Sequence, residues 1–204
     1  MTGRAGQQRI RILDAAQACF IRHGFHAASI DAIAREAGVS AGLIYRYFDS
    51  KNAIILAIID RQLQDKLTHI AALAGDPDIG RRFLDFFVRL RRGDPDVVNP
   101  ALLLEIGAQA TRDPQIATAM VEADQAASAA LREWLRGIIR RQEGRLEETE
   151  VRARTLAVQC LFDGLAMRAV KEPDLDIDEL AAALQAALPP LLDVRVADFG
   201  RRLR

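Results

Sequence analysis

Three side chains near the N-terminus, Cys19, His23 and His26, are of types that bind zinc. Cys19 and His23 are four residues apart and would therefore share one face of a helix. However, Cys19 also continues an apolar stripe with Ile12 and Ala16, and no further ligand follows nearby at a fixed spacing. We therefore expect no metal site, and we interpret Cys19 as part of the core.

The sequence lacks the common patterns of catalytic residues. It contains no Glu-x-x-His pair, no His-Glu-x-x-His, no glycine-rich phosphate loop and no Gly-x-Ser-x-Gly turn. The acidic residues Glu147, Glu148 and Glu150 fit the start of a helix, where the dipole favours negative charge. We predict that the protein is not an enzyme and needs no cofactor.

The segment from Ser29 to Lys51 is typical of two short helices joined by a tight turn. Ser29 and Ser40 can each accept a hydrogen bond from the first N–H groups of a helix. Gly38 can take the left-handed conformation that ends a helix. Apolar residues at 30, 33, 34, 37, 39, 44 and 48 would pack inward, which leaves one face of the second helix exposed.

That exposed face consists of Ala41, Gly42, Tyr45 and Arg46. Small residues let the backbone approach a surface, and Tyr45, Arg46 and Tyr47 supply hydrogen-bond donors and one positive charge. This is a helix-turn-helix layout, in which the second helix enters the major groove of DNA.

The elements that position this segment are helices throughout, because apolar residues recur at spacings of three and four. We expect an all-α fold of about nine helices, the last of which ends near Pro189-Pro190. Long helices are expected over 51–73, 115–141 and 147–170. Helix starts are marked by Asp76-Pro77, Asn99-Pro100 and Asp113-Pro114.

The composition fits a folded protein: 204 residues, 50% hydrophobic and 27% charged. Positive and negative charges balance over the whole chain, but residues 1–66 contain nine Lys or Arg and six Asp or Glu, so an anionic partner would dock there. Two cysteines are too few for a disulfide framework, and the polar N-terminus is not a signal peptide. We expect a cytoplasmic protein without a membrane span.

These features resemble the DNA-binding domain of the tetracycline-repressor (TetR) family of bacterial transcription regulators. The residues that match the family pattern in order are Ile33-Ala34, Ala37-Gly38-Val39-Ser40, Gly42, Tyr45, Tyr47-Phe48 and Lys51. The rest of the chain resembles the family only in length and helical layout. The resemblance implies a ligand-responsive regulator, most simply a repressor, that binds double-stranded operator DNA.

Carried over residue by residue, the resemblance divides the contacts to DNA into two groups, and Ser40, which caps the recognition helix, is also expected among the DNA-binding residues. The residues expected at phosphates are Ser29, Tyr45, Tyr47 and Lys51. The residues expected at base edges are Ala41, Gly42 and Arg46. Two positions depart from the family pattern: Ala28 stands where a hydroxyl is frequent, and Asp31 cannot bind a phosphate.

One recognition helix covers too few base pairs to select a genomic site, so we expect a homodimer on a palindromic operator. The last two long helices are the candidates for the interface, with Leu161, Leu165, Leu180, Leu184 and Leu188. The resemblance further implies a pocket for a largely hydrophobic small-molecule effector. Its candidate lining residues are Phe83, Phe86, Phe87, Leu103, Ile106, Met120, Trp134 and Phe162.

The expected organisation is a DNA-binding domain over 1–51, a regulatory and dimerisation domain over 52–192 and a basic tail over 193–204. Two other functions fit the same sequence. One is a small-molecule-binding or catalytic helical bundle in which the N-terminal motif is vestigial. The other is a DNA-binding protein that has no effector.

Overall fold

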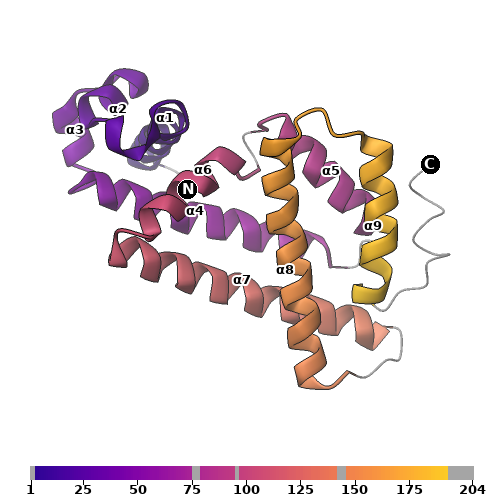
Figure 1. Ribbon diagram of the computed structural model, residues 1–204. Coiled ribbons are helices and arrows are strands. Elements are labelled where there is room, and N and C mark those ends of the chain that lie inside the picture. The colour runs from indigo at the N-terminus through magenta and orange to yellow at the C-terminus, as the bar shows by residue number, and fades with distance from the viewer. Residues whose placement is uncertain (1–2, 75–78, 95–96, 142–145, 193–204) are drawn as a thin grey trace. The chain divides into compact units, whose positions relative to one another are not determined.

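The structure is a computed structural model that describes residues 3–74, 79–94, 97–141 and 146–192. Within these residues the chain forms nine α-helices and no strand, which confirms the all-α prediction (Figure 1). The helices are α1 (Arg4–Ala27), α2 (Ile30–Ala37), α3 (Ala41–Tyr45), α4 (Lys51–Ala72), α5 (Ile79–Arg91), α6 (Pro100–Ala110), α7 (Pro114–Arg141), α8 (Glu148–Lys171) and α9 (Ile177–Leu192).

Helices α6 and α7 begin at the prolines of two Asx-Pro pairs, as predicted. The carboxylate of Asp113 accepts hydrogen bonds from the backbone N–H groups of Gln115 (2.9 Å) and Ile116 (3.3 Å). Asp113 thereby satisfies N–H groups that have no partner inside the helix. The third pair, at 76–77, lies outside the described residues.

The chain divides into two compact units. The first comprises residues 1–63 and 101–123, and the second comprises residues 64–100 and 124–204. The first unit therefore joins the N-terminal helices to α6 and to the start of α7, which are distant in sequence. This division differs from the contiguous one expected at residue 51, and α4 and α7 each contribute to both units.

The first unit is built around α1, with α2 packed against α1 and α3 against α2 (Figure 1). Buried isoleucines from six helices meet in its core, among them Ile12, Ile33, Ile44, Ile58, Ile106 and Ile116. Because Ile106 belongs to α6, this core is complete only when a segment from the middle of the chain has packed against the N-terminal helices.

Helix α1 contains one non-helical residue, Gly24, with φ 73° and ψ 163°. Glycine has no Cβ and therefore adopts positive φ without steric cost. The bend at Gly24 separates the long part of α1 from its last turn. There Phe25 turns into the core and packs against Phe20, with ring centroids 5.4 Å apart.

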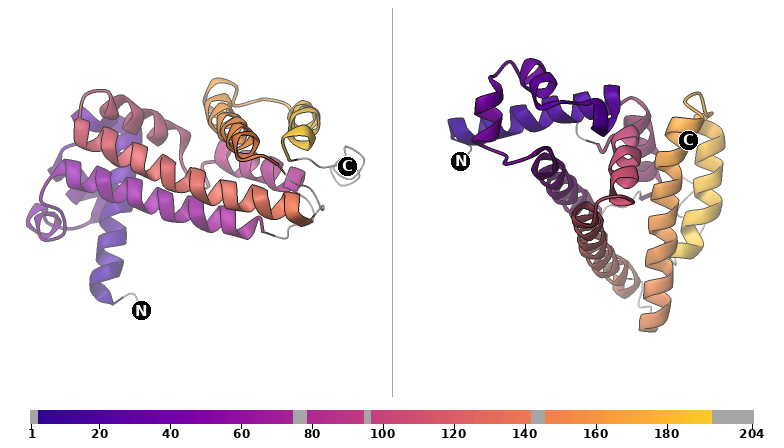
Figure 2. Two further views of the ribbon diagram at one scale, coloured as in Figure 1. Left: turned by 90° about the horizontal axis from the view of Figure 1, so that it is seen from below. Right: turned by 60° about the vertical axis from the view of Figure 1, so that its left-hand side comes forward.

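In the second unit, α5 packs against both α8 and α9 (Figure 1), and the C-terminal half of α4 lies beside α7 (Figure 2). Its core is a second cluster that includes Phe87 of α5, Leu135 of α7, Val158 of α8 and Leu184 of α9. Helix α9 does not stop at its prolines but runs on to Leu192. Proline is tolerated there because only the last turn loses hydrogen bonds.

Cys19 is buried in the first core, as predicted, and burial raises the pKa of its thiol. In the part of the chain that the structure describes, no three His, Cys, Asp or Glu side chains gather where they could hold a metal ion. None of the described helices is both long and apolar enough to cross a membrane. The tail expected at 193–204 lies outside the described residues.

Candidate nucleic-acid interface

The two capped helices form as the sequence predicts. The hydroxyl oxygen of Ser29 accepts a hydrogen bond from the N–H group of Ala32 (3.1 Å) at the start of α2. Gly38 ends α2 in the left-handed conformation, with φ 62°. The hydroxyl oxygen of Ser40 then accepts a hydrogen bond from the N–H group of Leu43 (3.2 Å) and starts α3. Each hydroxyl keeps its own hydrogen for donation to a ligand.

The side chains expected to face DNA lie on one side of α3 and its C-terminal end. Tyr45 is 55% exposed, and Gly42 and Arg46 are exposed as well. Ala41 and Tyr47 are half-buried, because both pack partly against the first core. The structure therefore brings small residues, hydrogen-bond donors and a cation together on one accessible surface.

Lys51 lies against the corner between α1 and α2. Its ammonium group donates hydrogen bonds to the backbone carbonyls of Phe25 (2.6 Å), Ala28 (3.0 Å) and His26 (3.4 Å), and it lies 4.2 Å from the ring centroid of Phe25. Burial lowers the pKa of Lys51. Because an ammonium has three N–H donors, these carbonyls engage all of them. In this structure Lys51 thus holds the corner between α1 and α2.

The two departures from the family pattern have different surroundings. Ala28 is completely buried at the same corner, so a side chain at this position does not face DNA. Asp31 is exposed in the first turn of α2. Its carboxylate stabilises the helix dipole and repels a phosphate that approaches this end of the helix.

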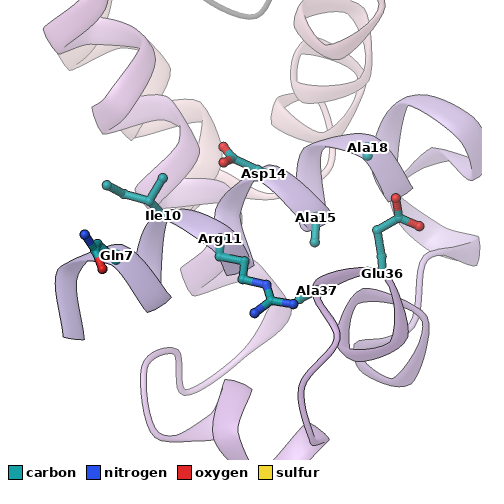
Figure 3. A pocket seen from close by; sticks show the side chains of 8 residues that line it. All are labelled: Gln7, Ile10, Arg11, Asp14, Ala15, Ala18, Glu36 and Ala37. Atoms are coloured by element: carbon teal, nitrogen blue, oxygen red, sulfur yellow. The ribbon is translucent and has the colours of Figure 1, made fainter. Parts of the chain in front are cut away.

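A hollow of about 390 Å³ lies on the face that α1 shares with α2 (Figure 3). Arg11 extends along this hollow toward Ala37, and the carboxylates of Asp14 and Glu36 lie on either side of it (Figure 3). An added Cβ at Gly38 would lie 2.7 Å from the guanidinium of Arg11. This side chain therefore covers the turn between α2 and α3.

The eight residues expected to line an effector pocket do not form one group. Ile106 and Met120 belong to the first core, whereas Phe83, Phe87 and Trp134 are buried in the second. In the second unit, a hollow of about 350 Å³ between α4 and α7 includes only one of the eight. Its lining residues are Leu67, Ile70, Ala71, Ala74, Ala130, Glu133 and Trp134.

Two further members of the expected pocket lie on the surface of α5 and α8. Phe86 and Phe162 are half-buried, and their rings meet edge to face at 5.2 Å between centroids. Phe162 also packs on Phe83, at 4.5 Å. Leu103 of α6 is half-buried.

The leucines expected at a dimer interface belong mostly to the core of a single subunit. Leu165, Leu180, Leu184 and Leu188 are buried by the helices of their own second unit, and Leu161 packs partly against the same cluster. Their apolar periodicity comes from packing among α5, α8 and α9. Within one chain these four leucines are covered, so they do not form an exposed apolar face.

Another face of α8 is exposed and carries apolar side chains on either side of Asp163. Leu156 is 62% exposed and Val170 is 44% exposed, and Cys160 lies between them on the same side of the helix. These residues lie four and ten positions apart, which places them on one helical face. The sequence did not single out this face because α8 has apolar residues almost all the way round.

Comparison with known proteins agrees with this geometry. Residues 12–58 match the family described as bacterial regulatory proteins, tetR family. Residues 81–193, more than half of the chain, match the BetI-type transcriptional repressor C-terminal family. The chain therefore belongs to the tetR family of bacterial regulatory proteins, as the resemblance predicted.

Individual relatives are more distant. The HTH-type transcriptional regulator UidR of Escherichia coli strain K12 is 38% identical over 119 residues, which are 57% of this chain and 59% of UidR. The solved structure of Salmonella enterica GusR has a TM-score of 0.76 at 24% identity and covers 94% of this chain and 98% of GusR. Bacillus subtilis FadR, solved in complex with stearoyl-CoA, has a TM-score of 0.67 at 19% identity, with coverage of 86% and 94%.

The two glycines of the helix-turn-helix should respond differently to alanine. We expect Gly38→Ala to destabilise the protein by about 1–2 kcal/mol, because the left-handed conformation is unfavourable for a residue with a Cβ. Gly42→Ala should be neutral or stabilising by up to about 1 kcal/mol, because it replaces glycine inside a helix and its Cβ would meet only open space and Ser40 Oγ at 4.0 Å. Urea denaturation of both variants measures the difference, and equal stabilities would contradict it.

Lys51→Ala should lower stability without changing the number of phosphate contacts. It leaves buried carbonyls without a donor, which costs about 1–3 kcal/mol. The salt dependence of DNA binding should stay as in the native protein and in Lys66→Ala, a control at an exposed lysine of α4. A slope of log affinity against log salt that falls by about 0.9 would instead identify Lys51 as a phosphate contact.

Proposed function

We propose that this protein is a homodimeric transcriptional repressor that binds a palindromic operator through α2 and α3 and is released by a small, largely hydrophobic effector. One observation carries the proposal: α3 presents Gly42, Tyr45 and Arg46 together on an accessible surface, beside a turn that is fixed by two serine caps. This function requires the compartment where bacterial DNA lies, the cytoplasm.

The chemistry of that surface fits the two kinds of contact that operator binding needs. A phosphate oxygen can accept hydrogen bonds from the hydroxyls of Ser29, Tyr45 and Tyr47, and such contacts position the protein without reading sequence. The guanidinium of Arg46 can donate two hydrogen bonds to a guanine edge, which does read sequence. Gly42 lets the backbone of α3 come close to the bases.

The exposed face of α8 supports the dimer, with a second copy of this chain as the partner. Exposed apolar side chains such as Leu156 and Val170 are unfavourable in water, and an interface with twofold symmetry covers them on both copies. The outer side of α9 carries Ala182, Ala183 and Ala186, whose small side chains permit close approach of another helix.

A small-molecule effector is supported by the second unit. The hollow between α4 and α7 has a volume in the range of ligand sites, and most of its lining is apolar. The FadR structure, which is similar in fold, holds stearoyl-CoA. Repression, as opposed to activation, is supported by the match of residues 81–193 to a repressor family.

Arg46→Ala should weaken binding to a selected duplex by about 1–3 kcal/mol and relax sequence preference at one position of each half-site. The control is Arg92→Ala, at an exposed arginine that follows α5. The native protein should be retained on nonspecific DNA, with affinity falling steeply between about 50 and 200 mM salt. Selection from a random-sequence pool measures both effects, and a native protein that retains no duplex at low salt would overturn the proposed function.

Leu156→Glu should convert the dimer to a folded monomer, because the interface would have to bury two carboxylates. Val121→Glu is the matched control, since Val121 is 55% exposed but lies on α7 in the first unit. Sedimentation at micromolar concentration, with circular dichroism to confirm folding, measures the result. A native monomer, or a Leu156→Glu dimer, would remove α8 from the interface.

A further inference from the structure

Helix α6 belongs to one part of the protein by sequence and to another by packing. Its residues lie inside the region that matches the C-terminal repressor family, 81–193. In the structure, however, α6 is part of the compact unit that holds the helix-turn-helix. Leu102 and Ile106 anchor it there in the first core. Helix α6 is thus a direct link between the regulatory sequence and the DNA-binding helices.

Glu105 of α6 makes a specific contact at the end of α1. Its Oε2 accepts a hydrogen bond from the backbone N–H group of Phe25 (3.0 Å), 80 residues away in sequence. Because Gly24 is not helical, this N–H group stands at the start of the last turn of α1 and lies outside the hydrogen-bond ladder of the preceding helix. Glu105 also lies 3.5 Å from the position of an added Cβ at Gly24, so the carboxylate sits directly against the bend.

Lys51 of α4 holds the same segment of chain, because its ammonium group donates hydrogen bonds to the backbone carbonyls of that segment. Phe25 therefore donates its N–H group to a carboxylate of α6 and presents its carbonyl to an ammonium of α4. The next residues, Ala28 and Ser29, lead directly into α2. Two charged side chains from distant helices thus fix the direction in which α2 leaves α1.

We propose that Glu105 is a positioning residue for DNA binding. It fixes the corner between α1 and α2, and through the peptide of Phe25 it fixes the direction of α2 and the placement of α3. The proposal rests on the proposed DNA-binding function and extends it to a residue that lies outside the helix-turn-helix. Because Leu102 and Ile106 anchor α6 independently, loss of the carboxylate releases the corner without unfolding the unit.

The test compares Glu105→Ala, Glu105→Gln and Glu122→Ala, the last at an exposed carboxylate of α7 in the same unit. The probes are a duplex selected by the native protein from a random pool and a scrambled duplex of equal length. Glu105→Ala should lose about tenfold in affinity for the selected duplex, the equivalent of one charged hydrogen bond. Its affinity for the scrambled duplex should be unchanged, because the phosphate-binding hydroxyls remain.

Glu105→Gln should bind like the native protein, since its amide oxygen can still accept from Phe25. Hydrogen exchange at the Phe25 amide provides a direct readout: it should be protected in the native protein and in Glu105→Gln and fast in Glu105→Ala. A merely structural role would lower both affinities equally, together with the melting temperature, and would overturn the proposal. Native affinity of Glu105→Ala for the selected duplex would also overturn it, while the proposed function would stand. A native protein that selects no duplex overturns both.

Discussion

The first unit depends on how the chain turns from α1 into α2. The turn is made at Gly24, and near it the N–H group of Phe25 and the C=O groups of Phe25 and Ala28 are bonded by side chains of other helices. Buried or half-buried polar groups of the backbone need partners, and here the partners are side chains. Glu105 supplies the acceptor and Lys51 supplies the donors. The contacts of Glu105 and Lys51 at this corner thus determine the direction of α2 relative to α1.

This arrangement explains why the compact unit around the helix-turn-helix is not contiguous in sequence. Helices α1 to α3 do not form the core of this unit by themselves. Leu102 and Ile106 of α6 and Ile116 of α7 also belong to it. Asn52 at the start of α4 donates to Asp113, the residue that caps α7, so α7 is tied to the same end of the unit. The DNA-binding helices are consequently held by segments that continue into the second unit.

The features that the sequence predicted correctly are local. Caps at Ser29 and Ser40, the left-handed Gly38 and the start of α7 depend on residues within four positions of one another. The exposed face of α3 follows from the same short-range periodicity. The contacts of Lys51 were not predicted, because its partners are the carbonyls of a corner more than 20 residues earlier and nothing in the spacing shows where that corner lies. Glu105 was missed for the same reason.

The leucines of α8 and α9 show a second limit of periodicity. An apolar stripe such as Leu180, Leu184 and Leu188 indicates that one face of a helix is buried. It does not indicate whether that face packs against the same subunit or another. On α8 and α9 the structure buries these three leucines and leaves Leu156 and Val170 exposed. An interface is marked by the apolar surface that folding leaves uncovered. For that reason a helix with apolar residues all round is the better candidate than the helix with the cleaner stripe.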